Sequence, residues 1–161
     1  MRIGFGEDIH RTTNGKPLLL GGIPIEEGPQ LKGHSDADVL LHAITDAILG
    51  AAALGDIGTH FPDSDEKWLN VNSSHFLETA INLAKDKGFE LINVDATIKA
   101  KNPKLSPYIG EIRSRIAGIL AIEIDNVSIK AKSNEGLDSV GEGAAIAASA
   151  IVLMEETASN K

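Results

Sequence analysis

Residues 34–50, HSDADVLLHAITDAILG, predict a helix with one apolar side. Apolar residues recur there every three or four positions, the period of a helix that packs against a core; they are Leu40, Leu41, Ile44, Ala47 and Ile48. Ser35 followed by Asp38 resembles a capping box, although Glu or Gln is the usual partner of the serine. We therefore expect the helix to begin at Ser35 and to end near Leu49.

Alternating apolar and polar residues predict strands on either side of this helix. The expected strands are residues 2–10, 89–100 and 127–131. Gly21-Gly22 joins 18–20 to 23–25 as a hairpin. Residues 144–154 fit two structures, because their alanines favour a helix while Ile146, Val152 and Met154 also follow a period of two.

Two further helices are expected, one from about Ser73 to Gly88 and one from Ser106 to about Ala121. Glycine suits a helix end and Pro107 suits a first turn. Residues 54–72 are rich in Gly, Pro, Asp, Ser and Asn, so we expect a long loop that is either a functional lid or disordered. The interspersed helices and strands predict one domain over residues 1–161, an α+β or α/β two-layer sandwich.

The composition limits the possible classes of function. The net charge is −8, with 15 Lys and Arg against 23 Asp and Glu, which argues against a nucleic-acid partner because nucleic-acid binders carry basic stripes. No apolar run approaches the ~18 residues of a membrane span, and no signal or transit peptide is apparent. We therefore expect a cytoplasmic protein. An acidic chain that binds a phosphorylated ligand needs a metal ion, helix N-termini or a few placed lysines.

Two groups of side chains are candidates for a metal site. Asp8 and His10 lie two positions apart on the first expected strand and so share a face. Asp38, His42 and Asp46 follow at i, i+4 and i+8 on the expected helix, where the two acids would support a metal-bound histidine. The chain has no cysteine, so zinc would have to use Asp and His. The alternatives are a solvated Asp-His pair and a structural histidine on a well-capped helix.

Four more segments are candidates for a substrate site, and each also has a plain structural explanation. Free backbone N–H groups beside His34 and Ser35 could face a phosphate. Asp56 and Asp63 could accept hydrogen bonds from sugar or polyol hydroxyls, or belong to ordinary turns. Residues 130–136 could hold phosphate and magnesium or form a solvated charged edge, and residues 100–105 could be a basic surface loop.

Four segments together resemble the 2-C-methyl-D-erythritol 2,4-cyclodiphosphate synthase family. They are RIGFGEDIH (2–10), HSDADVLLHAITDAILGAAALGDIGTHFPD (34–63), NVDATIKAKNPKLSPYI (93–109) and IKAKSNEGLDSVGEG (129–143). The resemblance covers nearly the whole chain in the same order and spacing. It implies the conversion of 4-diphosphocytidyl-2-C-methyl-D-erythritol 2-phosphate into 2-C-methyl-D-erythritol 2,4-cyclodiphosphate with release of CMP, in the non-mevalonate isoprenoid pathway.

The resemblance also implies a role for each site residue. The zinc ligands would be Asp8, His10 and His42, with one Zn²⁺ per subunit, and Glu135 would hold Mg²⁺ or Mn²⁺ with the substrate. His34 and Ser35 would contact one phosphate, and Lys132 and Ser133 the other. Asp56 and Gly58 would bind the ribose, Asp63 the methylerythritol hydroxyls, and Ala100, Lys104 and Leu105 the cytidine. Glu135, Ser133 and His34 would take part in catalysis by holding phosphates and metal, and no side chain would act as a base.

The family fold implied is a four-stranded mixed sheet with helices on one face, which would make residues 144–154 a strand. It also implies a homotrimer with active sites between subunits.

Gly136–Glu142 depart from many bacterial members, which carry Lys-Leu-Gly-Phe-Thr-Gly-Arg there. Ser139 and Glu142 remove an apolar wall and reverse a charge, so we do not expect the trimer cavity to bind an isoprenoid diphosphate. The rival functions are a metal-dependent phosphohydrolase and a non-catalytic trimeric cytidine-nucleotide sensor.

Overall fold

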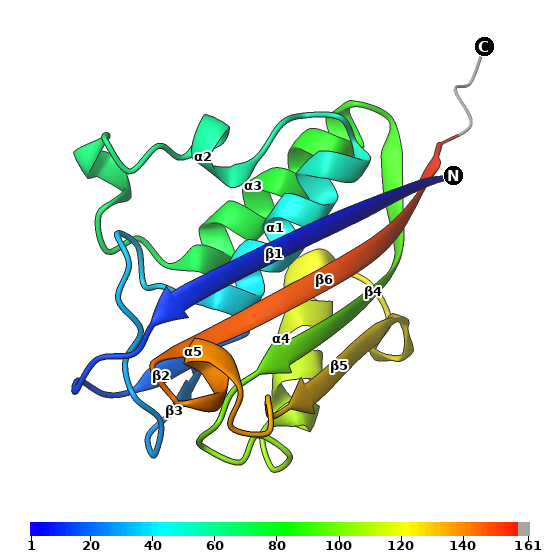
Figure 1. The fold of residues 1–161 in the computed structure, drawn as a ribbon. Helices are drawn as coiled ribbons and strands as arrows, with labels where there is room; N and C mark the ends of the chain where they lie inside the picture. Colours follow the sequence, from blue (N-terminus) through cyan, green and yellow to red (C-terminus); the bar gives the residue numbers. More distant parts are fainter. Residues whose placement is uncertain (158–161) are drawn as a thin grey trace.

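The computed structural model describes residues 1–157 and shows a four-stranded sheet with its long helices on one face (Figure 1). The strands are β1 (Arg2–Arg11), β4 (Phe89–Lys99), β5 (Val127–Lys132) and β6 (Ala145–Glu156), and their order is β1-β6-β4-β5. The pairs β1–β6 and β4–β6 are antiparallel, whereas β4–β5 is parallel. The expected mixed sheet is therefore confirmed.

Three long helices cover one face of this sheet: α1 (Val39–Ala51), α3 (Ser73–Asp86) and α4 (Ile109–Leu120). The hairpin is β2 (Leu18–Leu20) and β3 (Ile23–Ile25). The short helices are α2 (Ile57–His60), η1 (Glu66–Trp68), η2 (Ile124–Asn126) and α5 (Asp138–Gly141). No helix among residues 1–157 is both long enough and apolar enough to cross a bilayer.

The ambiguous segment near the C-terminus is strand β6, which lies between β1 and β4. Its alternate residues Ile146, Ala148, Ala150, Val152 and Met154 are buried under the helices. Alanine prefers a helix, but two neighbouring strands bond to the backbone of β6 along almost its whole length. Pairing with distant segments therefore decides the structure here.

The N-cap of helix α1 lies three residues later than the sequence indicates. Asp38, not Ser35, is the N-cap, and its carboxylate accepts from Leu41 N at 3.1 Å. The same carboxylate accepts from Gly21 N at 3.0 Å and Gly22 N at 2.7 Å in the β2–β3 turn. Asp38 thereby satisfies three backbone donors in a fully buried position, which explains why the helix begins there. Helix α4 also begins late, at Ile109 rather than Ser106.

Residues 54–72 are folded rather than extended as a plain loop, since α2 and η1 interrupt them. Their aromatic residues pack on α3: the ring of Phe61 lies 4.5 Å from that of Phe76, and Trp68 meets Phe76 at 5.8 Å. The backbone of the segment is also bonded to the chain before α1, through Asn70 N to His34 O at 2.9 Å. These contacts hold the segment over one end of α1 and α3.

Strand β1 packs against α1 with no side chain between them at two positions. A Cβ added to Gly4 would lie 1.8 Å from the Ala47 carbonyl oxygen, and one added to Gly6 would lie 2.1 Å from that of Ala43. The next residues on this face of β1 are Asp8 and His10. The glycines therefore bring the backbone that carries Asp8 close to the helix that carries His42.

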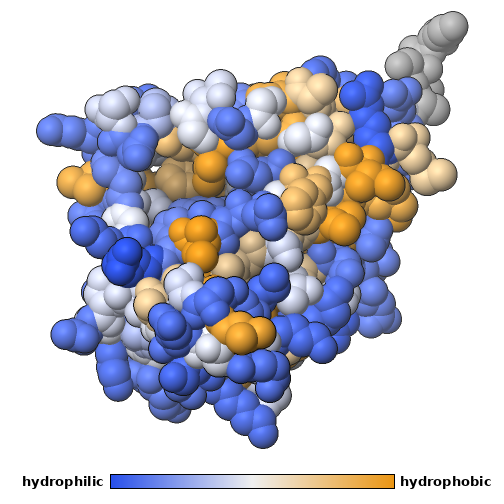
Figure 2. Space-filling view, in the orientation of Figure 1, coloured by the Kyte–Doolittle hydropathy of each residue, from blue (hydrophilic) through white to orange (hydrophobic). Residues whose placement is uncertain are grey.

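The other face of the sheet carries large apolar side chains on β1 and β6 (Figure 2). Ile3, Phe5 and Ile9 are 73%, 58% and 56% exposed, and Ile151, opposite Phe5, is 48% exposed. On β4 and β5 the same face is charged, with Lys130 Nζ 2.5 Å from Asp95 Oδ1. The half of the face formed by β1 and β6 is therefore apolar, and the half formed by β4 and β5 is polar. No element among residues 1–157 covers the four apolar side chains.

The contact between β1 and α1 generates a prediction for Gly6→Ala. The new methyl group would overlap the Ala43 carbonyl, so strand and helix must separate. Overpacking of this kind costs about 1–3 kcal/mol or more.

Gly118→Ala in α4 is the matched control, because its added Cβ meets nothing within 4 Å and alanine favours a helix. We expect denaturant unfolding to show a lower midpoint for Gly6→Ala and an equal or higher one for Gly118→Ala. A Gly6→Ala midpoint equal to that of the wild type would contradict the packing argument.

Candidate functional site

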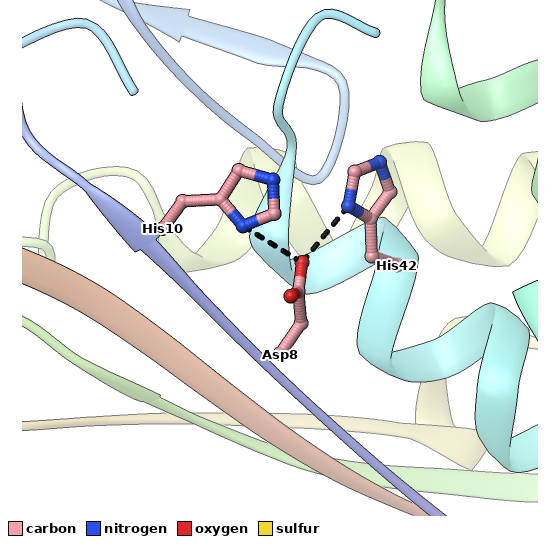
Figure 3. Close-up of side chains that lie close together, drawn as sticks. All are labelled: Asp8, His10 and His42. Carbon is pink, nitrogen blue, oxygen red and sulfur yellow. Dashed lines mark hydrogen bonds and ion pairs between the residues drawn. The ribbon is translucent and has the colours of Figure 1, made fainter. Parts of the chain in front are cut away.

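Asp8, His10 and His42 converge between β1 and the first turn of α1 (Figure 3). Asp8 Oδ2 lies 2.9 Å from His42 Nδ1 and 3.1 Å from His10 Nδ1. One potential ligand atom from each of the three residues lies within 4.8 Å of the other two. The expected convergence of the strand pair with the helix histidine is thus present in the structure.

The charges of this cluster favour an ionised carboxylate. Burial by itself would raise the pKa of Asp8, but the hydrogen bond with His42 and the proximity of the His10 ring outweigh it and lower the pKa to about 2. For His10, burial opposes the charged ring, yet the neighbouring Asp8 carboxylate raises the pKa overall. The Asp8 carboxylate is therefore ionised at neutral pH, which is the form in which a carboxylate ligates a metal.

The cluster fits a divalent cation on its own chemistry. His10 Nδ1 is buried and, although it lies near Asp8, makes no hydrogen bond of acceptable geometry. A buried nitrogen without a partner is costly, and a metal ion would satisfy it. Two imidazoles and one carboxylate are also a ligand set that zinc enzymes use, with a fourth position left open. Asp8, His10 and His42 are therefore a candidate metal site.

The second nitrogen of His42 has partners that the sequence interpretation missed. Ser73 Oγ, at the start of α3, lies 2.8 Å from His42 Nε2, and Ser35 Oγ lies 3.1 Å from it. Asp36 accepts from both the hydroxyl and the N–H of Ser73. No short-range spacing links residues 36, 42 and 73, so only their neighbouring positions in space could reveal this group.

The two acids expected to support His42 lie elsewhere. Asp38 precedes the first helical residue, and its carboxylate accepts from the backbone N–H groups of Leu41, Gly21 and Gly22. The helix face that was expected to carry Asp38, His42 and Asp46 therefore begins only at His42. Asp46 accepts from Ile57 N at 2.7 Å, and its pKa is raised by burial. Neither of these two carboxylates has a hydrogen bond to the His42 ring, although His42 N donates to the Asp38 carbonyl at 3.0 Å; the carboxylate found beside the ring is Asp8.

A cavity of about 240 Å³ opens directly onto the metal site. Of the expected substrate residues it contains His34, Ser35, Gly58 and Asp63. Its apolar wall, which sequence reasoning did not identify, comes from Ile57, Phe61, Trp68 and Phe76. Asp56 lies beside it as the exposed N-cap of α2, where it accepts from Thr59 N at 2.8 Å and from Thr59 Oγ1 at 2.7 Å.

A second cavity, of about 320 Å³, lies where β4 and β5 end. It brings together five of the expected substrate residues, Ala100, Lys104, Leu105, Lys132 and Ser133. Its remaining lining residues are Lys101, Asn102, Pro103, Ser106 and Ala131. Lysine amines and hydroxyls beside small apolar groups suit a phosphorylated ligand with a flat ring.

Glu135 belongs to the region of this second cavity and not to the Asp8 cluster. Ser133 Oγ donates to Glu135 Oε1 at 2.8 Å, just after β5. Strand β5 is one edge of the sheet and β1 is the other, with β6 and β4 between them. Three strand spacings of roughly 4.8 Å separate these edges by about 14 Å. One chain therefore carries the two halves of the expected site on opposite edges of its sheet.

The chain matches known proteins along nearly its whole length. Residues 1–155 match the model of the YgbB family. A 2-C-methyl-D-erythritol 2,4-cyclodiphosphate synthase of Gloeobacter violaceus is 53% identical over 156 residues, which are 97% of this chain and 96% of the relative. The synthase of Clostridioides difficile is 49% identical over 160 residues, 99% of each chain.

Solved structures agree with these matches. A 2C-methyl-D-erythritol-2,4-cyclodiphosphate synthase described as a CDP-bound form superposes with a TM-score of 0.89 at 36% identity, covering 96% of this chain and 100% of that one. The bifunctional IspDF of Campylobacter jejuni superposes with a TM-score of 0.93 at 41% identity, covering 96% of this chain and 42% of the larger protein. The chain belongs to the YgbB family, that of the 2-C-methyl-D-erythritol 2,4-cyclodiphosphate synthases.

Proposed function

We propose that this chain is a cyclodiphosphate synthase that converts 4-diphosphocytidyl-2-C-methyl-D-erythritol 2-phosphate into 2-C-methyl-D-erythritol 2,4-cyclodiphosphate and CMP. The single observation that supports this best is the convergence of Asp8, His10 and His42 beside a cavity, in a chain about half identical to synthases over its full length. The 2-phosphate attacks the β-phosphorus, the bond from that phosphorus to the CMP oxygen breaks, and CMP leaves with the electron pair.

Asp8, His10 and His42 would hold Zn²⁺, and Glu135 would hold Mg²⁺ or Mn²⁺ together with the substrate. Bound divalent cations supply charge neutralisation to the phosphates and polarise phosphorus toward attack. Backbone N–H groups near His34 and Ser35, and the Lys132 amine, add positive potential for the two phosphates. This local charge compensates for the net charge of −8, which would otherwise oppose an anionic substrate.

The remaining residues would orient the substrate. Asp63 and the cavity beside the metal site would take the methylerythritol part, with Asp56 and Gly58 near the ribose. The second cavity, with Ala100, Lys104 and Leu105, would take the cytidine ring. Positioning of two anionic groups for in-line attack is the main requirement of such a reaction, so no side chain is assigned as a base or nucleophile. Glu135, Ser133 and His34 act by holding phosphates and metal.

The active site would form between subunits of a homotrimer. The two cavities lie on opposite sheet edges of one chain, about 14 Å apart by strand spacing, which is too far for a diphosphate to bridge within the chain. A neighbouring copy could place its second cavity beside the metal site of the first. The exposed apolar side chains Ile3, Phe5, Ile9 and Ile151 supply a surface that association would bury.

The activity itself is tested by incubating the purified protein with the cytidylyl substrate, Zn²⁺ and Mg²⁺ and following ³¹P NMR. We expect the cyclic diphosphate and CMP to appear together in equal amounts. An opened monophosphate would instead indicate a phosphohydrolase. Binding of CMP without turnover, and without any need for zinc, would indicate a nucleotide sensor.

Asp8→Ala and His42→Ala are each expected to abolish zinc retention, because each removes one of only three protein ligands. Metal content after dialysis, measured by elemental analysis, checks this prediction. His75→Ala is the control, since His75 is an exposed histidine on α3 outside the metal cluster. Full metal content in either ligand variant would refute the ligand set.

Glu135→Gln is expected to leave zinc bound and to lower turnover, because Glu135 is not one of the three residues of the metal cluster. The amide keeps the hydrogen bond from Ser133 but loses the negative charge that attracts a second cation. Zinc content and the rate of CMP release are measured on the same preparation. Loss of zinc in this variant would show that the division between the two metals is wrong.

A further inference from the structure

A chain of hydrogen bonds extends from the outer side of His42 to Asp36. His42 Nδ1 faces Asp8 Oδ2 at 2.9 Å, while Nε2 lies 2.8 Å from Ser73 Oγ. The Ser73 hydroxyl in turn bonds to Asp36 Oδ1, and Asp36 Oδ2 accepts from Ser73 N at 2.9 Å. Ser73 is fully buried and His42 is only 8% exposed, so water does not compete freely for these bonds.

The direction of each bond in this chain follows from the types of its groups. An ionised carboxylate only accepts, so the single hydroxyl hydrogen of Ser73 points to Asp36. The Ser73 oxygen, 2.8 Å from Nε2, then has only lone pairs toward His42 and accepts from it, which places the ring hydrogen on Nε2; Ser35 Oγ, at 3.1 Å, is a second acceptor within reach. A neutral imidazole with hydrogen on Nε2 has its lone pair on Nδ1. The lone pair then faces Asp8 Oδ2 across 2.9 Å, and two acceptors at this distance would be satisfied by a cation that they share.

We infer that Asp36 and Ser73 are positioning residues, which fix the tautomer and orientation of His42 so that Nδ1 presents its lone pair to the metal. This inference rests on the metal site proposed above and adds to it two residues that do not touch the metal. Metal-ligating histidines usually donate their other N–H to an oxygen, and loss of that oxygen lowers metal affinity.

The same bonds connect the metal site to the end of the 54–72 segment. Asp36 N donates to Val71 O at 3.1 Å, two residues before Ser73. Ser73 is the first residue of α3 and follows directly on the segment whose Phe61 and Trp68 line the cavity. The backbone beside the cavity and the hydroxyl that orients His42 are therefore joined through Asp36.

Two variants test the inference through zinc affinity, measured by competition with a fluorescent chelator. Ser73→Ala removes the nearer acceptor for Nε2–H and leaves Ser35 Oγ at 3.1 Å. In Asp36→Asn one oxygen replaces two that each accept from a backbone N–H, Oδ2 from Ser73 N at 2.9 Å and Oδ1 from Asp38 N at 3.2 Å. The shorter bond favours the amide oxygen at the Oδ2 position, so the NH₂ group faces the hydroxyl. Ser73 must then donate toward His42. We expect each variant to bind Zn²⁺ roughly 10–100-fold more weakly, and Ser74→Ala, with no side-chain hydrogen bond in the structure, to bind it as the wild type does.

The tautomer itself is read from two-bond ¹H–¹⁵N spectra of the histidines in the zinc-bound protein, because in metal-free protein the Asp8 carboxylate, 2.9 Å from Nδ1, would itself attract the ring hydrogen. We expect His42 of the wild type to bind the metal through Nδ1 and to carry hydrogen on Nε2, with faster exchange of that hydrogen in Asp36→Asn, which a merely structural role of Asp36 would not produce. Metal bound through Nε2 in the wild type, or unchanged zinc affinity in both variants of a zinc-binding protein, would overturn this inference alone. Failure of the wild type to bind zinc would overturn the proposed metal site as well.

Discussion

The contact of two backbones, β1 on α1, is the constraint on which the site depends. Gly4 and Gly6 leave no side chain between the strand and the carbonyl oxygens of the helix, so the two elements approach as closely as their main chains allow. Two residues farther along the same face of β1, Asp8 meets His42 from the first turn of α1. Rigid regular elements thus hold ligands whose spacing has to be correct within fractions of an ångström.

Hydrogen bonds to backbone groups complete this arrangement at the start of α1. The buried Asp38 joins the first turn of the helix to the β2–β3 turn, while Asp36 joins the preceding loop to α3. These acids increase the negative charge of an already acidic chain, yet each is satisfied by backbone donors. Positive potential for a phosphate ligand then comes from a few local sources, namely a metal ion, free N–H groups and lysines at the other edge of the sheet.

The positions of the two cavities account for the apolar and charged residues that the open face of the sheet exposes. One chain carries a metal cluster at the edge strand β1 and a lysine-lined cavity at the opposite edge, after β5. In the proposed homotrimer, a second copy of the chain would bring the two cavities together. The exposed apolar residues of β1 and β6 would then be buried, and the charged residues of β4 and β5 would align the copies.

The sequence by itself determined most of the elements, because periodicity and turn residues are local signals: the strands, the hairpin through Gly21-Gly22, and the Asp8 and His10 pair on one face of β1. Tertiary structure decided the rest. Pairing with two neighbouring strands made the alanine-rich β6 a strand. Three backbone N–H groups that bond to the Asp38 carboxylate moved the start of α1 to that residue. Packing on α3 ordered the 54–72 segment. The partners of His42 come from residues 31 and 34 positions away. Such contacts depend on how distant elements pack, which no local pattern encodes.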